Sequence, residues 1–163
     1  MAADVGGGDP GVMRVSAKTD YALRALLVLA ERSPAYVKAE ALIAAEDLPR
    51  KFVESILSEL RRAGLVTRRR GAEGGYGLAV PAEAVTVGAV IRVLDGPIAT
   101  GPPTRPAGVG RAARAGGPDP SARLTQVWTA ASASVSSVLD ATTLAHLLSG
   151  QLPEHVRRLA EDA

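Results

Sequence analysis

The chain has 163 residues, 47% of them hydrophobic, a size and apolar content that suit one core-forming domain with an appendage. Nineteen basic residues against 17 acidic ones leave a formal net charge of +2, which by itself indicates no particular partner. The absence of cysteine excludes disulfides, cysteine nucleophiles and iron–sulfur clusters held by the chain's own thiolates. No apolar run approaches the roughly 20 residues that cross a bilayer, and no signal-peptide pattern is present, so we expect a cytoplasmic protein without membrane contact.

The N-terminal third predicts two helices separated by a turn. Ser16 is a suitable N-cap for a helix over about residues 17–31, because its hydroxyl can accept a hydrogen bond from the first turn. That segment carries two apolar stripes, so we expect two packing partners, such as its own domain and a second subunit. A second helix is expected over about residues 39–45, and the polar, proline-containing residues 46–49 end it.

A third helix and a hairpin follow directly. Arg50 opens a helix that runs to about residue 63, and one of its faces is apolar: Val53, Ile56, Leu57 and Leu60. After Gly64, two short strand-like segments flank a glycine-rich tip, which predicts a β-hairpin. Two short helices joined by a tight turn and followed by a hairpin form a winged helix-turn-helix pattern. The predicted fold class is therefore mainly α with a small β-hairpin.

Positive charge is concentrated in this region. Residues 50–70 hold seven basic and two acidic side chains, a net of +5: Arg50, Lys51, Arg61, Arg62, Arg68, Arg69 and Arg70 against Glu54 and Glu59. Solvated charge on an edge strand would explain part of this, but three consecutive arginines favour a polyanion such as DNA. Because side chains alternate along a strand, Arg68 and Arg70 should share one face and Arg69 should lie on the other.

The C-terminal half predicts a linker and a long helix. Thr86 can cap a helix over residues 87–94, ended by an Asp-Gly-Pro turn. Residues 98–119 are rich in glycine and proline, and we interpret them as a flexible loop that is either a solvated linker or a contact with an anionic partner. Asp119-Pro120 begins a long helix, and Thr142 or Thr143 can cap a short one that ends at Gly150.

The long helix carries an apolar seam with spacings of 4, 3, 4 and 3: Leu124, Trp128, Ala131, Val135 and Val138. This heptad-like spacing predicts dimerisation, although packing against the same chain produces the same pattern. The tail after Gly150 either forms a helical turn around Val156 or stays irregular.

No residue pattern indicates catalysis. The only histidines, His146 and His155, have no triad partners and are interpreted as surface residues. The glycine-rich segment 71–75 lacks the lysine and the serine or threonine of a phosphate-binding loop. No metal-ligand spacing occurs, so we expect no catalytic residue, no metal, no cofactor and no enzyme.

Several segments in order resemble the Rrf-type (BadM-like) winged helix-turn-helix transcriptional regulators. They are residues 13–26, 48–53, 60–66 and 70–78, followed by 85–97 and the helix with Trp128. The resemblance covers Met13 to about Ser149 and favours Met13 as the native start. It implies a homodimeric, sequence-specific transcription factor, usually a repressor, whose long helices cross and whose winged domains bind a pseudo-palindromic operator in double-stranded DNA.

The resemblance also implies a DNA-binding surface on the third helix and the hairpin. Its residues are Arg50, Lys51, Glu54 and Ser55 on the helix, with Arg68, Arg69, Arg70, Gly74 and Gly75 on the wing, while Tyr76 is expected to pack within the hairpin. Many members carry three cysteines in the loop before the long helix, and this chain has none there. It also has Asp47 where relatives often have glycine and Glu46 where an apolar residue is common, and Asp20 is more simply a helix-start carboxylate.

We therefore expect five segments along the chain. They are a disordered extension (1–12), a winged helix-turn-helix domain (13–97), a flexible loop (98–119), dimerisation helices (120–149) and a tail (150–163). A small molecule or a partner protein is expected as effector, unless binding is constitutive. The alternative function is a winged-helix protein-interaction module that does not bind DNA.

Overall fold

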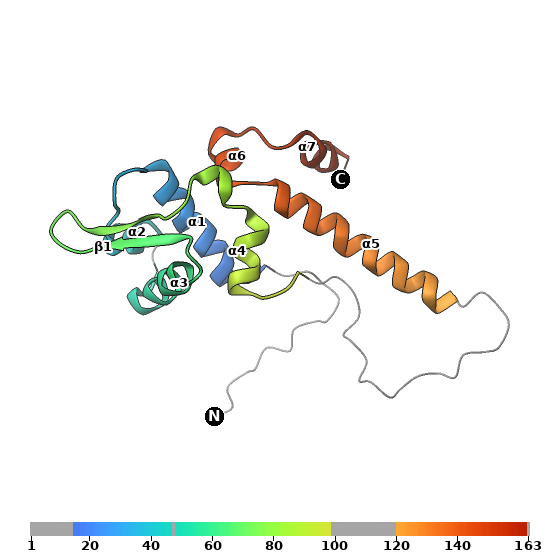
Figure 1. The fold of residues 1–163 in the computed structure, drawn as a ribbon, viewed down its shortest axis with the longest axis horizontal. Coiled ribbons are helices and arrows are strands. Elements are labelled where there is room, and N and C mark those ends of the chain that lie inside the picture. The colour runs from blue at the N-terminus through green and yellow to red at the C-terminus, as the bar shows by residue number, and fades with distance from the viewer. Residues whose placement is uncertain (1–14, 47, 99–119, 163) are drawn as a thin grey trace, which may run out of the picture.

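The computed structural model describes residues 15–46, 48–98 and 120–162 (Figure 1). Its elements are α1 (Ala17–Glu31), α2 (Ala39–Glu46), α3 (Arg50–Arg62), β1 (Val66–Arg69), β2 (Gly75–Leu78), the 3-10 turn η1 (Ala82–Ala84), α4 (Val87–Leu94), α5 (Pro120–Ala141), α6 (Leu144–Ser149) and α7 (Glu154–Glu161). The predicted fold class is confirmed. The expectations for residues 1–12, for the loop up to Asp119 and for Asp47 fall outside the described residues. No helix in the described ranges has the length and apolarity to cross a membrane.

Helix α1 is the centre of the winged domain. The Ser16 hydroxyl accepts a hydrogen bond from the Thr19 backbone N–H at 3.1 Å, which confirms the predicted cap. Ala22, Leu26 and Leu29 are fully buried, and α1 contacts the helices α2, α3, α4 and α6 as well as β2. The predicted apolar face of α3 is also confirmed, because Val53, Ile56, Leu57 and Leu60 all lie in the core.

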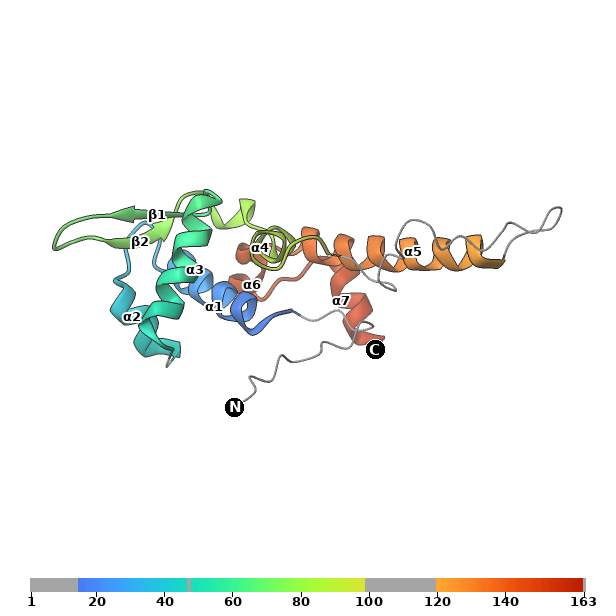
Figure 2. The same ribbon diagram turned by 90° about the horizontal axis from the view of Figure 1, so that it is seen from below.

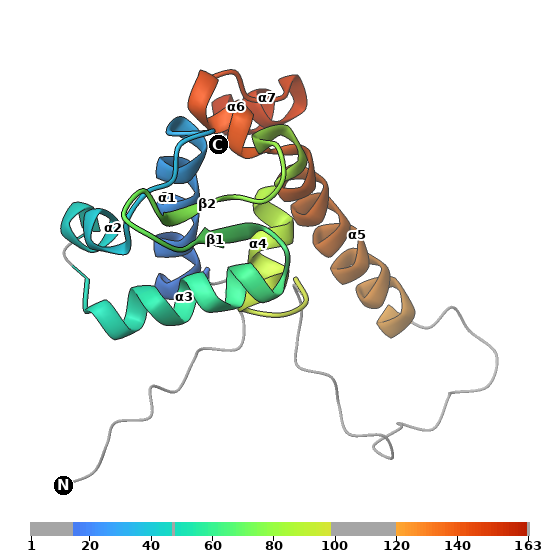
Figure 3. The same ribbon diagram turned by 60° about the vertical axis from the view of Figure 1, so that its left-hand side comes forward.

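The wing is an antiparallel hairpin of β1 and β2 with a third contact that the sequence did not predict. The register pairs Val66 with Leu78 and Arg69 with Gly75. On the other edge of β2, Val37 forms an isolated bridge with Tyr76, in which each backbone N–H donates to the other residue's carbonyl at 2.8 Å. The segment between α1 and α2 therefore holds the wing against the helical body. Figure 3 shows α3 running beneath this hairpin.

The C-terminal helices are joined to the winged domain where α5 ends and α6 begins, and α6 packs there against α1 and η1. Val87 N–H donates to the Thr142 carbonyl at 2.9 Å, and Leu144 N–H donates to the Val85 carbonyl at 3.0 Å. Beside this junction, the Arg92 guanidinium donates to both carboxylate oxygens of Asp140 at 2.7 and 2.6 Å. From there α5 projects away from the body, as Figure 2 shows.

The two short C-terminal helices settle three points that the sequence left open or assigned differently. Thr143, and not Thr142, caps α6. The Nδ1 atom of His146 accepts a hydrogen bond from the Thr143 N–H at 3.2 Å, so this half-buried histidine belongs to the helix cap and is not a plain surface residue. The tail forms α7 over residues 154–161.

Candidate nucleic-acid interface

The outer face of α3 carries the polar residues that the sequence singled out. Arg50, Lys51, Glu54 and Ser55 are all exposed, on the side of the helix opposite to the buried apolar face. Helix α3 is tied to α1 by Lys18, whose ammonium group lies 2.7 Å from a carboxylate oxygen of Glu59. The core and this ion pair therefore fix the helix while its polar face stays open to solvent.

Arg50 does not point freely into solvent. Its Nη2 atom donates to Oε1 of Glu40 at 2.7 Å, and its Nη1 atom donates to Oε1 of Glu54 at 3.3 Å. The pKa of the Glu40 carboxyl is lowered by its own backbone N–H and then by the Arg50 guanidinium. The pKa of Arg50 is raised, chiefly by its hydrogen bond with Glu40. The first residue of α3 is thus held by one carboxylate from α2 and one from the next turn of α3.

The wing arginines lie on opposite faces of the hairpin, as alternation requires for Arg68 and Arg69. The Arg68 guanidinium lies 5.6 Å from the ring centroid of Tyr76, and that of Arg69 lies 5.9 Å from the ring of Tyr36. Such cation–π contacts limit the orientations that each guanidinium adopts. Strand β1 ends at Arg69, so the alternation argument does not extend to Arg70, which is exposed beyond the strand.

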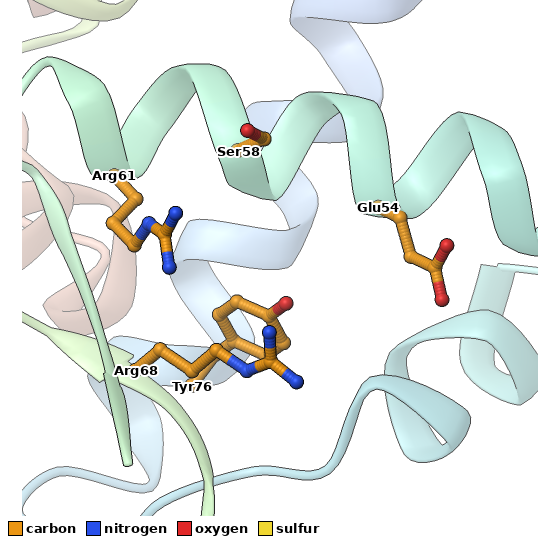
Figure 4. A pocket seen from close by; sticks show the side chains of 5 residues that line it. All are labelled: Glu54, Ser58, Arg61, Arg68 and Tyr76. Carbon is orange, nitrogen blue, oxygen red and sulfur yellow. The ribbon is translucent and has the colours of Figure 1, made fainter. Parts of the chain in front are cut away.

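A polar cavity of about 290 Å³ separates α3 from the wing. Glu54, Ser58 and Arg61 line it from α3, and Arg68 and Tyr76 line it from the hairpin (Figure 4). In Figure 4 the side chains of Arg61 and Arg68 approach the space from its two sides. The arrangement provides two guanidinium groups, which bind phosphate oxygens well, beside hydroxyl groups that can donate or accept.

Ser58 and Arg61 line this cavity but were not among the DNA-binding residues predicted from the sequence. They lie four and seven residues after Glu54, the spacing that places side chains on one face of a helix. The spacing from Glu54 could therefore have indicated from the sequence that these two side chains share its face of α3.

Gly74 and Gly75 have structural reasons to be glycine. A Cβ atom at Gly74, which is buried, would collide with the backbone of Arg69 and Arg70. At Gly75 it would lie 2.5 Å from the Val37 carbonyl oxygen. Both residues allow close backbone packing at the turn end of the wing, and direct contact with DNA at these positions stays a prediction.

The predicted seam of α5 is only partly covered within the chain. Leu124 is 53% exposed and Trp128 is 39% exposed, whereas Ala131, Val135 and Val138 are half-buried. Val127, which the seam omitted, is 58% exposed. The projecting half of α5 therefore presents apolar side chains to solvent.

Comparison with known proteins gives consistent matches. The family model described as "Rrf2: Iron-dependent Transcriptional regulator" matches residues 15–150. A protein of Mycobacterium tuberculosis strain H37Rv, named as an HTH-type transcriptional regulator, is 45% identical over 92% of this chain and 90% of its own length. The HTH-type transcriptional regulator CymR of Bacillus subtilis is 39% identical, over 53% of this chain and 63% of its own length.

Solved structures show the same fold. The structure of CymR, described as the global cysteine regulator of B. subtilis, has a TM-score of 0.68 and 32% identity, and covers 85% of this chain and 98% of its own. The structure of IscR from T. potens has a TM-score of 0.63 and 29% identity, over 84% of this chain and 87% of its own.

The family description refers to iron, and the donor atoms of this chain do not suit an iron–sulfur cluster. Thiolates are the usual ligands of such clusters, and the chain has no cysteine. Within the described ranges, no three His, Asp or Glu side chains group as a metal site. Residues 99–119 contain a single carboxylate, Asp119, and no histidine. The residues present therefore do not fit such a cluster.

Proposed function

Because the chain belongs to the Rrf2 family, it is a DNA-binding transcriptional regulator and not an enzyme, and we propose that it acts as a homodimeric repressor. It binds a pseudo-palindromic operator in double-stranded DNA, without an iron–sulfur cluster of its own. It acts in the cytoplasm, where the DNA that it binds is transcribed. The family match favours DNA binding over the alternative of a protein-interaction module.

The observation that carries the DNA-binding mode is the pairing of an exposed polar helix face with a cationic wing across one cavity. In this mode α3 enters the major groove, where Arg50, Lys51, Glu54 and Ser55 face base edges. The wing arginines Arg68, Arg69 and Arg70 lie along the phosphate backbone, with the Gly74-Gly75 segment beside it. Phosphate contacts fix the register of the protein, and the helix reads the sequence.

Dimerisation rests on α5. Its exposed Leu124, Val127 and Trp128 form an apolar surface that a second copy of the helix covers in a symmetric pair. Ala131, Val135 and Val138 continue the seam toward the winged domain. Two-fold symmetry then matches the two half-sites of the operator, whose centres lie one helical turn or a multiple of it apart.

Control of the regulator comes from a small molecule or a partner protein. Such an effector acts through the dimer helix α5 or through the basic loop that precedes it. Without an effector, occupancy of the operator follows protein concentration alone.

The salt dependence of duplex binding tests the DNA-binding mode. Affinity is measured by fluorescence anisotropy at several salt concentrations for the wild type and for a variant with Arg68, Arg69 and Arg70 replaced by alanine. We expect the slope of log affinity against log salt to flatten by about 0.9 for each lost phosphate contact. An unchanged slope contradicts the assignment of the wing to the backbone.

Mapping of bound sites across the genome then identifies the operator and the neighbouring genes. For a repressor, transcripts of those genes rise when the regulator is deleted. Transcripts that fall contradict the assignment as a repressor, while the DNA-binding mode stands.

A further inference from the structure

Arg50 belongs to the proposed base-reading surface and is held by two carboxylates. Each of its two terminal nitrogens donates a hydrogen bond to a different carboxylate, one from Glu40 and one from Glu54. The Arg50 side chain is 56% exposed and that of Glu40 is 63% exposed, so burial does not force the pair together. The shorter contact, 2.7 Å, comes from Glu40 in α2, ten residues earlier in the chain. A residue of the helix before the turn therefore helps to orient the first side chain of α3.

The two carboxylates change what Arg50 can offer to DNA. Together they place two negative charges beside one positive charge. Arg50 with its two carboxylates therefore attracts a phosphate less than a free arginine does. The guanidinium still has hydrogen-bond capacity. It has five N–H donors, and one on each terminal nitrogen is used, which leaves three.

A base edge suits this remaining capacity better than a phosphate does. Guanine presents two uncharged acceptors in the major groove, O6 and N7, and the usual partner of that pair is an arginine that donates twice. Uncharged acceptors are repelled much less by the neighbouring carboxylates than a phosphate anion is. A guanidinium already held by Glu40 also loses less conformational freedom when it binds.

We propose that Glu40 is a positioning residue for specificity: it orients Arg50 toward a guanine in each half-site and cancels the attraction of Arg50 for phosphates of any sequence. This inference rests on the proposed placement of α3 in the major groove. Glu40 itself touches no base. Its effect is to reduce binding to non-operator DNA and to keep the Arg50 guanidinium available for one base.

The central variant is Glu40→Gln, which keeps a side chain of the same size and an acceptor oxygen but removes the charge. The probes are a selected operator duplex and a random-sequence duplex of equal length, and affinities are measured across salt concentrations. For the random duplex we expect tighter binding and a slope steeper by up to about 0.9, because Arg50, left with only the longer contact to Glu54, becomes available to one more phosphate. The ratio of operator to random affinity should fall, and selection from a random duplex library should show a weaker preference for guanine.

Two further variants separate this mechanism from a general charge effect. Glu154→Gln removes a carboxylate from the first turn of α7, where it pairs with Arg158 at 3.9 Å, and it should leave both affinities unchanged. In an Arg50→Ala background, Glu40→Gln should no longer change the salt slope. Arg50→Ala alone should reduce discrimination at the guanine position by on the order of 10- to 100-fold.

The outcomes that overturn the inference are distinct from those that overturn the DNA-binding mode. If Arg50→Ala weakens operator binding but Glu40→Gln leaves both duplexes unchanged, Glu40 has no positioning role. If Glu40→Gln tightens random-duplex binding equally with and without Arg50, it acts as a plain negative charge and the inference is wrong. If Arg50→Ala and the triple wing variant both leave operator affinity unchanged, the proposed placement of α3 itself fails. Thermal melts of each variant confirm that the fold is retained.

Discussion

Gly71 and Gly75 both have a positive φ in the wing, but only Gly75 packs against Val37, so substitutions at the two positions measure the contact between β2 and Val37. Gly71 has a φ of +105° with nothing within 4 Å of an added Cβ atom. Gly75 has a φ of +153°, and an added Cβ atom would lie 2.5 Å from the Val37 carbonyl oxygen. Alanine at Gly71 therefore introduces backbone strain alone, whereas alanine at Gly75 also pushes the hairpin away from Val37.

The expected magnitudes follow from these contacts. Positive φ at a residue with a Cβ atom costs on the order of 1–2 kcal/mol, so Gly71→Ala should lower the free energy of unfolding by about that amount. Gly75→Ala should lose in addition the two 2.8 Å hydrogen bonds between Val37 and Tyr76. At roughly 0.5–1.5 kcal/mol each, these bonds make Gly75→Ala less stable than Gly71→Ala by about 1–3 kcal/mol.

Urea denaturation followed by circular dichroism measures the difference, and anisotropy with an operator duplex measures its effect on binding. We expect Gly75→Ala to weaken duplex binding more than Gly71→Ala, because the wing that carries Arg68 and Arg69 loses its attachment to the helical body. Equal destabilisation by the two substitutions would refute the idea that Val37 holds the wing.

Three other outcomes are expected. Trp128→Ala should shift sedimentation toward the monomer, while Gln126→Ala, two residues away on the same exposed part of α5, should not; an unchanged dimer would contradict the seam. The pKa of Asp140 is lowered mainly by the Arg92 hydrogen bonds, so this pair stabilises the fold above pH 3.8 and loses its effect as pH falls below it. The melting temperature of the wild type should therefore drop more steeply in that range than that of Asp140→Asn. Protein purified without oxygen should show no visible absorption, and a coloured protein would disprove the argument from the missing thiolates.

Local patterns were sufficient to predict most of the elements. The apolar spacing in α3 and the hydroxyl caps at Ser16 and Thr86 involve residues three or four positions apart, and the structure confirms each of them. The boundaries of α4 agree with the expected range, because its cap and its closing turn both lie within a few residues of it. Interactions of this range are visible in a sequence before any tertiary contact is known.

Contacts between distant segments were not predictable in this way. Val37 forms its bridge as a single residue in a connecting segment, so it has no alternating pattern that would mark a strand. The pair between Glu40 and Arg50 spans the turn between two helices, and its distance depends on how that turn folds. The cavity between α3 and the wing likewise depends on the angle between helix and hairpin, although the spacing of Ser58 and Arg61 indicated which α3 side chains line it.

The attachment of α5 near Asp140 has a mechanical consequence. The helix has 22 residues, and at 1.5 Å per residue it is about 33 Å long. Its described ties to the winged domain lie at its C-terminal end, beside Arg92 and Gly88, so the angle of the whole helix is set at that junction. A rotation of about 10° at that junction moves the far end by about 6 Å, close to two base-pair steps of duplex DNA. In the proposed dimer, a small change in packing at this junction would therefore change the spacing of the two α3 helices by an amount that is large on the scale of an operator.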